Sequence, residues 1–245
     1  MPNRQTSSVQ DKSAEREASL AKLAAEGPEF RTSGWDSAKF GRALTLLDGD
    51  VGDSIAGPVL DLGCGSMGLS NELGKRGLKP VGADLVYEIL RDVAATRAPG
   101  VPLVACDAEL LPFRNESLAL VAHNQTLHHF PDPRPVLRDI RRVLKPGGLL
   151  LSIETNGWNP YVYYSHTTPA KKKSRFISEN QKVFGVIKFQ KMLVNEGFRI
   201  RGRRLINFDF ARFLSPFDSI LGKIPLVNLI FSGSMVILSE KARQR

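Results

Sequence analysis

The sequence predicts an α/β protein built on a doubly wound, mostly parallel sheet of seven strands. From Pro58 onwards, short apolar segments alternate with segments of helical period, as in parallel sheets that carry helices on both faces. The chain has 245 residues and is 42% hydrophobic, which is enough for one substantial core. We therefore expect one domain over residues 31–245, preceded by a flexible N-terminal arm over residues 1–30.

Seven segments are predicted to be strands because they are short, apolar and bounded by residues that favour turns. They cover residues 58–63, 79–85, 101–108, 118–124, 149–155, 198–204 and 233–240. The fifth, LLLSIET, is typical of a strand buried on both faces of a sheet. The order of these strands along the chain favours parallel pairing through helical crossovers.

Helices are predicted between these strands, over residues 36–47, 69–77 and 88–98. The best-marked helix follows the fourth strand. Asp132 can cap it, Pro133 suits its first position, and residues 145–148 (KPGG) end it. A further helix is expected from a cap at Ser178 through residue 195.

Two insertions, at about residues 157–177 and 206–231, interrupt the alternation of strands and helices. Insertions of this length on a compact scaffold usually carry function. The first holds three of the four tyrosines and the second holds five of the thirteen phenylalanines. Pro216 and Pro225 divide the second into pieces too short to span a bilayer. We expect it to form a lid before the last strand, with a membrane-dipping surface or a dimer interface as alternatives.

Positive charge is concentrated in the last third of the chain. Residues 161–245 hold 16 Lys and Arg against 5 Asp and Glu, whereas residues 1–160 hold 18 against 20. A basic half favours an anionic partner, such as a phosphorylated or carboxylated molecule, an acidic lipid surface or nucleic acid. A solubilising surface explains the same pattern equally well.

The sequence predicts a cytoplasmic protein without a metal site. It has no apolar run of about 18 residues and no secretory signal at its N-terminus. Cys64 and Cys106 lack the spacing of a metal or redox site, so we expect both to be packing residues.

Polar and glycine residues follow the first four predicted strands. In open α/β sheets these loops converge on a ligand crevice at the carboxyl ends of the strands. The stretch DLGCGSMG has glycines at 63, 65 and 68, which satisfies the pattern G-x-G-x-x-G. Asp84 follows the second strand, 21 residues beyond Gly63, where a carboxylate can accept both hydroxyls of a ribose. The third and fourth strands are followed by Asp107 with Ala108 and by Asn124 with His128 and His129.

These motifs, in this order, resemble those of the class I S-adenosylmethionine-dependent methyltransferases, in the branch that includes ubiquinone and menaquinone biosynthesis enzymes. The resemblance covers about residues 56–155. VLDLGCG resembles the first motif, VGADL the second, DAELLPF with LALV the third and fourth, and VLKPGGLLL the motif before the fifth strand. It implies a Rossmann-like methyltransferase fold, S-adenosylmethionine as cofactor, and methyl transfer to an O, N or C atom of a small acceptor.

The resemblance also assigns cofactor contacts. A carboxylate two residues before the first glycine suits a ligand that carries an ammonium group, as the methionine end of S-adenosylmethionine does. Asp61 and the backbone of Gly63 and Gly65 would hold this end. Met67 stands where the family usually has glycine, so we expect the loop to close differently, and a non-catalytic S-adenosylmethionine-binding protein is one alternative. The other implied contacts are Asp84 with the ribose, Leu85 against the adenine, Asp107 with the adenine amino group beside Ala108, and Asn124.

The candidate catalytic residues are His129 and His128, in QTLHHFPDP. Displacement at a sulfonium mainly requires alignment and a dry pocket, but a hydroxyl or protonated nitrogen acceptor also benefits from a base. Histidine suits that role near neutral pH. We expect the adjacent rings to point to different sides. The alternative is that one ring packs and the other binds the next loop.

Tyr161, Tyr164 and Glu154 are the candidate acceptor-binding residues, since ring faces and hydroxyls at this position would line a pocket. The pattern E-x-N-x-x-N-P resembles methyltransferases of natural-product, glycan and lipid-precursor pathways. Residues 171–173 (KKK), with Arg203 and Arg204, favour an amphipathic or anionic acceptor, or one presented at an acidic membrane to which the protein binds peripherally. An RNA or protein methyltransferase is the second alternative, although no RNA-binding module is present and nucleic acid is not favoured. A monomer and a homodimer are both compatible with the sequence.

Overall fold

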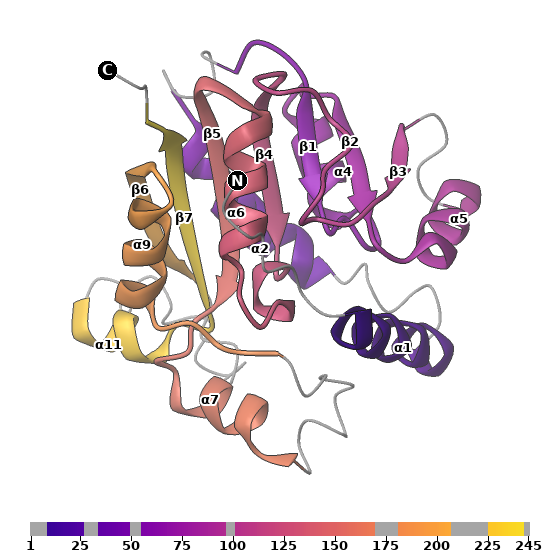
Figure 1. The fold of residues 1–245 in the computed structure, drawn as a ribbon. Helices are drawn as coiled ribbons and strands as arrows, with labels where there is room; N and C mark the ends of the chain where they lie inside the picture. The colour runs from indigo at the N-terminus through magenta and orange to yellow at the C-terminus, as the bar shows by residue number, and fades with distance from the viewer. Residues whose placement is uncertain are drawn as a thin grey trace.

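The computed structural model describes residues 9–26, 34–49, 55–96, 101–169, 181–206 and 225–242. A seven-stranded sheet with the order β3-β2-β1-β4-β5-β7-β6 lies between helices (Figure 1). Strands β1 to β5 are parallel, and β7 runs antiparallel to both of its neighbours. The predicted α/β class and mostly parallel seven-stranded sheet are confirmed.

All seven predicted strands form. Their bounds are β1 (Val59–Leu62), β2 (Pro80–Asp84), β3 (Leu103–Ala105), β4 (Leu118–Asn124), β5 (Leu144–Thr155), β6 (Phe198–Ile206) and β7 (Ser234–Lys241). Strand β5 begins five residues before the predicted start at Leu149. A register shift between Leu118 and Leu120 of β4 accommodates the KPGG segment, so that Leu144 pairs with Leu118 while Leu149 pairs with Leu120.

The helices agree with the prediction at most positions. They are α1 (Val9–Glu26), α2 (Gly34–Leu44), α4 (Gly68–Lys75), α5 (Tyr87–Thr96), α6 (Arg134–Val143), α7 (Pro160–Thr167), α9 (Val186–Asn195) and α11 (Pro225–Phe231), with 3₁₀ turns η2 (Thr45–Leu47) and η3 (Leu127–His129). Helix α9 begins later than predicted, because Phe184 bridges to Asn156 as a strand residue and Gly185 is extended. The predicted cap Ser178 lies outside the described residues.

The N-terminal segment differs from the flexible arm that we expected. Over Val9–Glu26 the structure has α1, whose sequence is rich in Ala, Leu, Glu and Lys, all strong helix formers. Leu20 of α1 packs against the apolar cluster formed by α5 and the first glycine loop. In Figure 1 the helix lies beside α5, beyond the lower ends of the central strands.

Two apolar cores lie on the opposite faces of the sheet. One contains Ile140 of α6, Phe189 of α9 and Leu150 of β5, whereas the other contains Leu73 of α4 and Leu151 of β5. Because successive residues of β5 face different cores, both sides of this strand are apolar, as predicted for LLLSIET. Burial of each such side chain stabilises the fold by roughly 1.5–3 kcal/mol.

Two asparagines join helices α7 and α11, which come from the two predicted insertions. Asn156 Nδ2 donates to Leu229 O at 2.8 Å and to Ser232 O at 3.0 Å. Asn159 caps α7 through its side-chain oxygen and donates from Nδ2 to Phe231 O at 2.9 Å. The E-x-N-x-x-N-P motif therefore connects the two insertions at the end of β5.

Most of the second insertion, residues 207–224, lies outside the described residues, as do residues 170–180 of the first. The predicted lid, four of its five phenylalanines and the KKK run at 171–173 fall within these ranges. Across the described ranges, no helix combines the length and the apolar character that spanning a bilayer requires.

Candidate functional site

The loops after β1, β2, β3 and β4 meet at one edge of the sheet, as predicted. The backbone N–H groups of Gly63 and Cys64 donate to Ala83 O at 2.8 and 3.0 Å, which joins the loops after β1 and β2. Cys106 N donates to Asp84 O at 2.9 Å and joins β2 to the loop after β3. The candidate cofactor residues on these loops are therefore close neighbours.

Asp84 contacts the glycine loop directly. Its Oδ2 accepts from Gly65 N at 3.0 Å and its Oδ1 accepts from Val86 N at 2.9 Å. A carboxylate offers about four acceptor positions, and these bonds use two of them. Asp84 is partly exposed, so it fixes the loop and keeps capacity to accept hydroxyl groups of a ligand.

Gly63 has a structural role that the sequence did not indicate. It adopts a φ of 69°, which disfavours side chains, and a Cβ there would lie 2.4 Å from Thr126 Oγ1. Thr126 comes this close because its hydroxyl donates to Leu62 O at 3.0 Å. The missing side chain at Gly63 thus accommodates the loop after β4.

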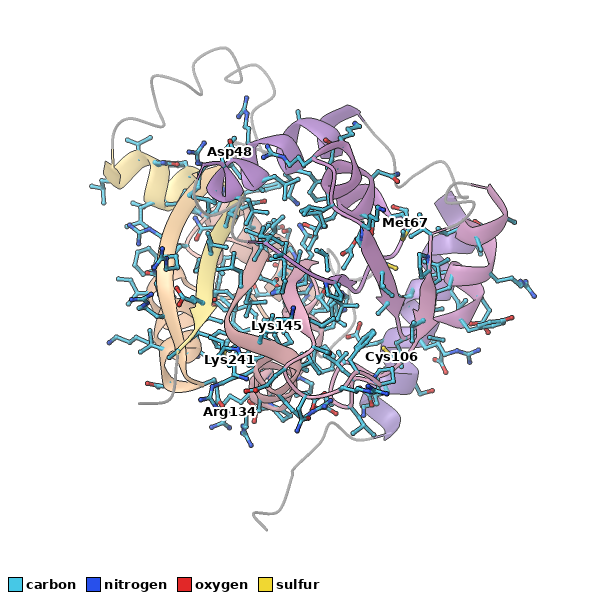
Figure 2. All side chains as sticks on the ribbon, turned by 90° about the horizontal axis from the view of Figure 1, so that it is seen from above. Asp48, Met67, Cys106, Arg134, Lys145 and Lys241 are labelled. Atoms are coloured by element: carbon cyan, nitrogen blue, oxygen red, sulfur yellow. The ribbon has the colours of Figure 1, made fainter. Side chains whose placement is uncertain are left out.

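Met67 replaces the glycine that the family usually has at this position without opening the loop. Its φ of 66° is left-handed, which costs a non-glycine residue about 1–3 kcal/mol. The side chain is fully buried against Val86 and Ile89 on the α5 side of the sheet (Figure 2). Burial of the methionine offsets the strain. The backbone therefore takes the conformation that a glycine would supply.

Asp61 is almost completely buried within β1, with 1% of its surface exposed. Burial raises its pKa to about 7, partly opposed by hydrogen bonds from Ser70, whose Oγ donates to Oδ2 at 2.6 Å. The nearby charge of Asp84 raises this pKa further. The two carboxylates are thus close enough to interact, and a cation between them would favour their charged forms.

Asn124 presents an unsatisfied acceptor at the end of β4. Among the residues that the structure describes, its Oδ1 is buried and has no hydrogen-bond partner. A buried acceptor without a hydrogen bond costs about 1–3 kcal/mol of stability. β4 pairs directly with β1, which carries Asp61. An N–H donor of a bound ligand would satisfy this oxygen.

Asp107 and Leu85, for which the resemblance implies contacts with adenine, lie in the loops after β3 and β2. Asp107 Oδ1 accepts from Glu109 N at 2.9 Å, and its Oδ2 accepts from Lys12 Nζ of α1 at 2.5 Å. Leu85 is 41% exposed, which is unusual for an apolar side chain beside a sheet, whereas Ala108 is buried. The contact with Lys12 had no sequence signal, because α1 is separated from this loop by 95 positions.

The two histidines stack instead of pointing to different sides, so that expectation is wrong. Their ring centroids are 4.4 Å apart. His128 is buried, its Nδ1 lies 2.7 Å from Glu154 Oε2, and burial lowers its pKa. The side chain of His129 is 33% exposed, and its Nδ1 lies 2.5 Å from Glu15 Oε2 of α1 and 3.0 Å from Gln181 Nε2. His129 is therefore the member of the pair that solvent can reach.

Glu154 lies inside the protein and not in an acceptor pocket. It is 0% exposed, and its Oε1 accepts from Thr126 N at 3.2 Å and from Leu127 N at 2.8 Å, while Oε2 faces His128. Burial acts to raise the pKa of Glu154, but His128 and His123 outweigh it, and the net shift is downward. Glu154 thus holds η3, which carries both candidate catalytic residues.

Tyr161 and Tyr164 are exposed on α7, by 44% and 51%. Helix α7 lies at the same end of the sheet as η3 (Figure 1). Their contact with an acceptor remains a prediction. The sequence signal for this surface is the group of three tyrosines in the first insertion, which also exposes Trp158 and Tyr163 by 38% and 57%.

Comparison with known families and curated proteins gives a match over the part of the chain that carries these loops. Residues 60–152 match the family described as methyltransferase domain. A demethylmenaquinone methyltransferase of Corynebacterium kroppenstedtii is 38% identical over 96 residues, which cover 39% of this chain and 41% of that protein. The aligned part thus spans less than half the length of this relative.

Solved structures share the fold over nearly the whole chain. A chain from the complex between the Haloferax volcanii Trm112 methyltransferase activator and a methyltransferase is 20% identical, with a TM-score of 0.66 over 95% of this chain and 99% of that one. The [4+2]-cyclase SpnF is 18% identical, with a TM-score of 0.63 over 100% of this chain and 99% of that one. At these identities the likeness concerns the fold.

Three findings point to the same family. They are the strand order, the order of the motifs on the converging loops, and the family match over residues 60–152. Residues 60–152 therefore form a methyltransferase domain of the class I, S-adenosylmethionine-dependent family.

Proposed function

We propose that the protein transfers a methyl group from S-adenosylmethionine to an O, N or C atom of a small, amphipathic or anionic acceptor. Asn124 carries the proposal most directly. Its buried Oδ1 lacks a donor, and the ammonium group of the cofactor would supply one. Asp61, whose pKa burial raises to about 7, would gain a cation beside it. A cationic N–H donor suits both groups, whereas a neutral donor would satisfy only Asn124 Oδ1.

The other residues at this edge suit the remaining parts of the cofactor. Asp84 has free acceptor positions for ribose hydroxyls, and the exposed Leu85 offers an apolar surface for the adenine ring. Asp107 would accept from the adenine amino group beside Ala108. Gly63 and Gly65 keep side chains away from the loop backbone. These groups come from four converging loops, so the fold brings them together only when the sheet has formed.

When bound, the cofactor supplies an electrophilic methyl group on a sulfonium leaving group. The residues of the chain would orient the acceptor, exclude water and remove a proton. His129 is our candidate for the last step. Glu15 accepts from Nδ1, which leaves Nε2 as the nitrogen that takes a proton from an acceptor hydroxyl or ammonium. His128, with Nδ1 held by Glu154 and little exposure, would support η3.

The acceptor class is proposed from the surface around α7. Exposed aromatic side chains of α7 and its flank, with Leu226 and Phe231 of α11, form an apolar region. The edge strand β6 adds the exposed Arg203 and Arg204 towards its carboxyl end, which lies at the same end of the sheet as α7. An apolar region joined to cations suits an amphipathic molecule with an anionic group, and it also suits peripheral contact of a cytoplasmic protein with an anionic membrane.

The proposed activity is tested by incubating the protein with methyl-labelled S-adenosylmethionine and a cell extract that contains metabolites, RNA and protein, followed by mass spectrometry of the labelled product. We expect label in a small molecule, and a loss of about 10²-fold in turnover for His129→Ala with cofactor binding retained. Full turnover in that variant would exclude His129 as the base. Absence of label from every metabolite, with label in RNA or protein, would overturn the acceptor class.

Membrane contact has a separate test by co-sedimentation with lipid vesicles. We expect binding to vesicles with anionic lipid at low salt, weakened at high salt. Equal binding to vesicles of zwitterionic lipid alone would contradict an electrostatic contact.

A further inference from the structure

We infer that helix α1 is a lid that controls exchange of the cofactor. This inference rests on the proposed function. Helix α1 lies outside the segment that matches the family, so its role does not follow from the match. Its contacts with the rest of the protein lie on α5 and on the loops that carry the candidate cofactor and catalytic residues.

Charged side chains of α1 reach the loops after three different strands. Lys12 Nζ contacts Asp107 Oδ2 at 2.5 Å and Glu109 Oε2 at 2.9 Å, both in the loop after β3. Glu15 Oε2 contacts His129 Nδ1 at 2.5 Å, in the turn after β4. Arg16 pairs with Glu88 at the start of α5, after β2. Two of these contacts engage groups that we assign to the cofactor site and to catalysis.

The strand order places α1 across the cofactor loops. Strands β2 and β1 lie between β3 and β4 in the sheet. A helix that contacts the loops after β3 and β4 therefore passes over the ends of β2 and β1, where Asp84 and the glycine loop lie. Lys12 and Glu15 are three positions apart and so share one face of α1. The docked helix would enclose a cofactor bound at these loops.

The attachment of α1 is of a kind that opens readily. The side chains of Lys12, Asp107 and His129 in its ion pairs are partly exposed, at 25%, 31% and 33%, whereas Glu15 and Glu109 are 12% and 1% exposed. Such pairs contribute little individually and are screened by salt. Among the described side chains of α1, Leu20 packs against the apolar cluster of α5 and the first glycine loop. We therefore expect α1 to undock often enough for the cofactor to exchange, and we expect this undocking to be the step that limits the exchange rate.

The test measures release of labelled S-adenosylmethionine after mixing with excess unlabelled cofactor. Lys12→Met should speed dissociation by about threefold, and the double variant Lys12→Met with Glu15→Gln by about tenfold, because exposed pairs of this kind are each worth a few-fold in an equilibrium. Association should also be faster, since both directions require opening. Glu17→Gln is the matched control, because Glu17 is an exposed glutamate of the same helix that accepts a hydrogen bond from Ser13 of α1 itself.

The possible outcomes separate the lid from the proposed function. Cofactor binding with unchanged rates in the double variant would overturn the lid alone, and so would equal acceleration by Glu17→Gln. If neither the wild type nor any variant binds the cofactor, both the proposed function and the lid are overturned. Amide hydrogen exchange of the ligand-free protein gives a second measurement. We expect protection over Val9–Glu26 that the double variant loses, and an unprotected α1 in the wild type would overturn the inference.

Discussion

Replacing Glu154 with Gln tests the network that holds the candidate catalytic turn η3. The carboxylate accepts from Thr126 N and Leu127 N through one oxygen and faces His128 Nδ1 with the other. An amide keeps the first oxygen as an acceptor. It puts an N–H donor where the second oxygen was, so His128 must change the nitrogen that carries its proton.

The expected cost follows from these contacts. Two backbone bonds survive with a neutral acceptor in place of a charged one, and the contact with His128 is reversed or lost. Hydrogen bonds to charged groups contribute about 1.5–3 kcal/mol and those between neutral groups about 0.5–1.5 kcal/mol. We therefore expect the free energy of unfolding to fall by about 1–3 kcal/mol, which lowers the melting temperature of a domain of this size by roughly 2–12 °C.

Urea unfolding followed by circular dichroism provides the measurement, with Glu196→Gln as the control. Glu196 pairs with Arg138 at 3.1 Å on the surface, where the loss of a pair costs below about 1 kcal/mol. Cofactor-dependent turnover should fall along with stability in Glu154→Gln, because η3 carries both histidines. A cost no larger than that of Glu196→Gln would refute the claim that Glu154 holds the turn.

Three further substitutions have expected effects. Burial raises the pKa of Asp61 to about 7, so the folded state holds the carboxyl proton more tightly than the unfolded state. The free energy of unfolding should therefore fall as pH rises from about 4 to about 7. Asp61→Asn should remove that fall in urea titrations at several pH values. Met67→Gly relieves about 1–3 kcal/mol of backbone strain but removes a buried side chain worth about 2–5 kcal/mol, so we expect a net loss of about 1–3 kcal/mol. A gain in stability would contradict our account of the loop. Gly63→Ala should cost at least about 2 kcal/mol, since its Cβ meets Thr126; thermal unfolding close to that of the wild type would show that this approach is not tight.

Much of the fold was predictable because its determinants are local. The strands β1, β4 and β5 are apolar and bounded by turn residues. The helix before β5 follows Asp132 and Pro133 and has a regular apolar face. The loops that carry Asp61, Asp84 and Asp107 converge because parallel strands place their carboxyl ends at one edge. Predicting that these three aspartates lie together required only the order of the strands and helices along the chain.

The features that were missed depend on contacts between distant segments. Glu154 and Thr126 meet because β4 and β5 pair in one register, with Asn124 opposite Ile153. The helical composition of α1 gave no indication that Lys12 and Glu15 would reach loops about 100 positions away. The late start of α9 reflects a bridge between Phe184 and Asn156, which tertiary packing determines. Local patterns carry no information about such pairings.

The most direct test of the central claim is titration calorimetry of S-adenosylmethionine into the wild type and into Asn124→Ala and Asp84→Ala. The wild type should bind the cofactor, and each variant should lose about 10- to 100-fold in affinity, because each removes acceptors that the cofactor would use. Ser13→Ala, on the exposed surface of α1, should bind like the wild type. Absence of binding by the wild type, or equal affinity in all four proteins, would contradict a cofactor site at the ends of β1, β2 and β4.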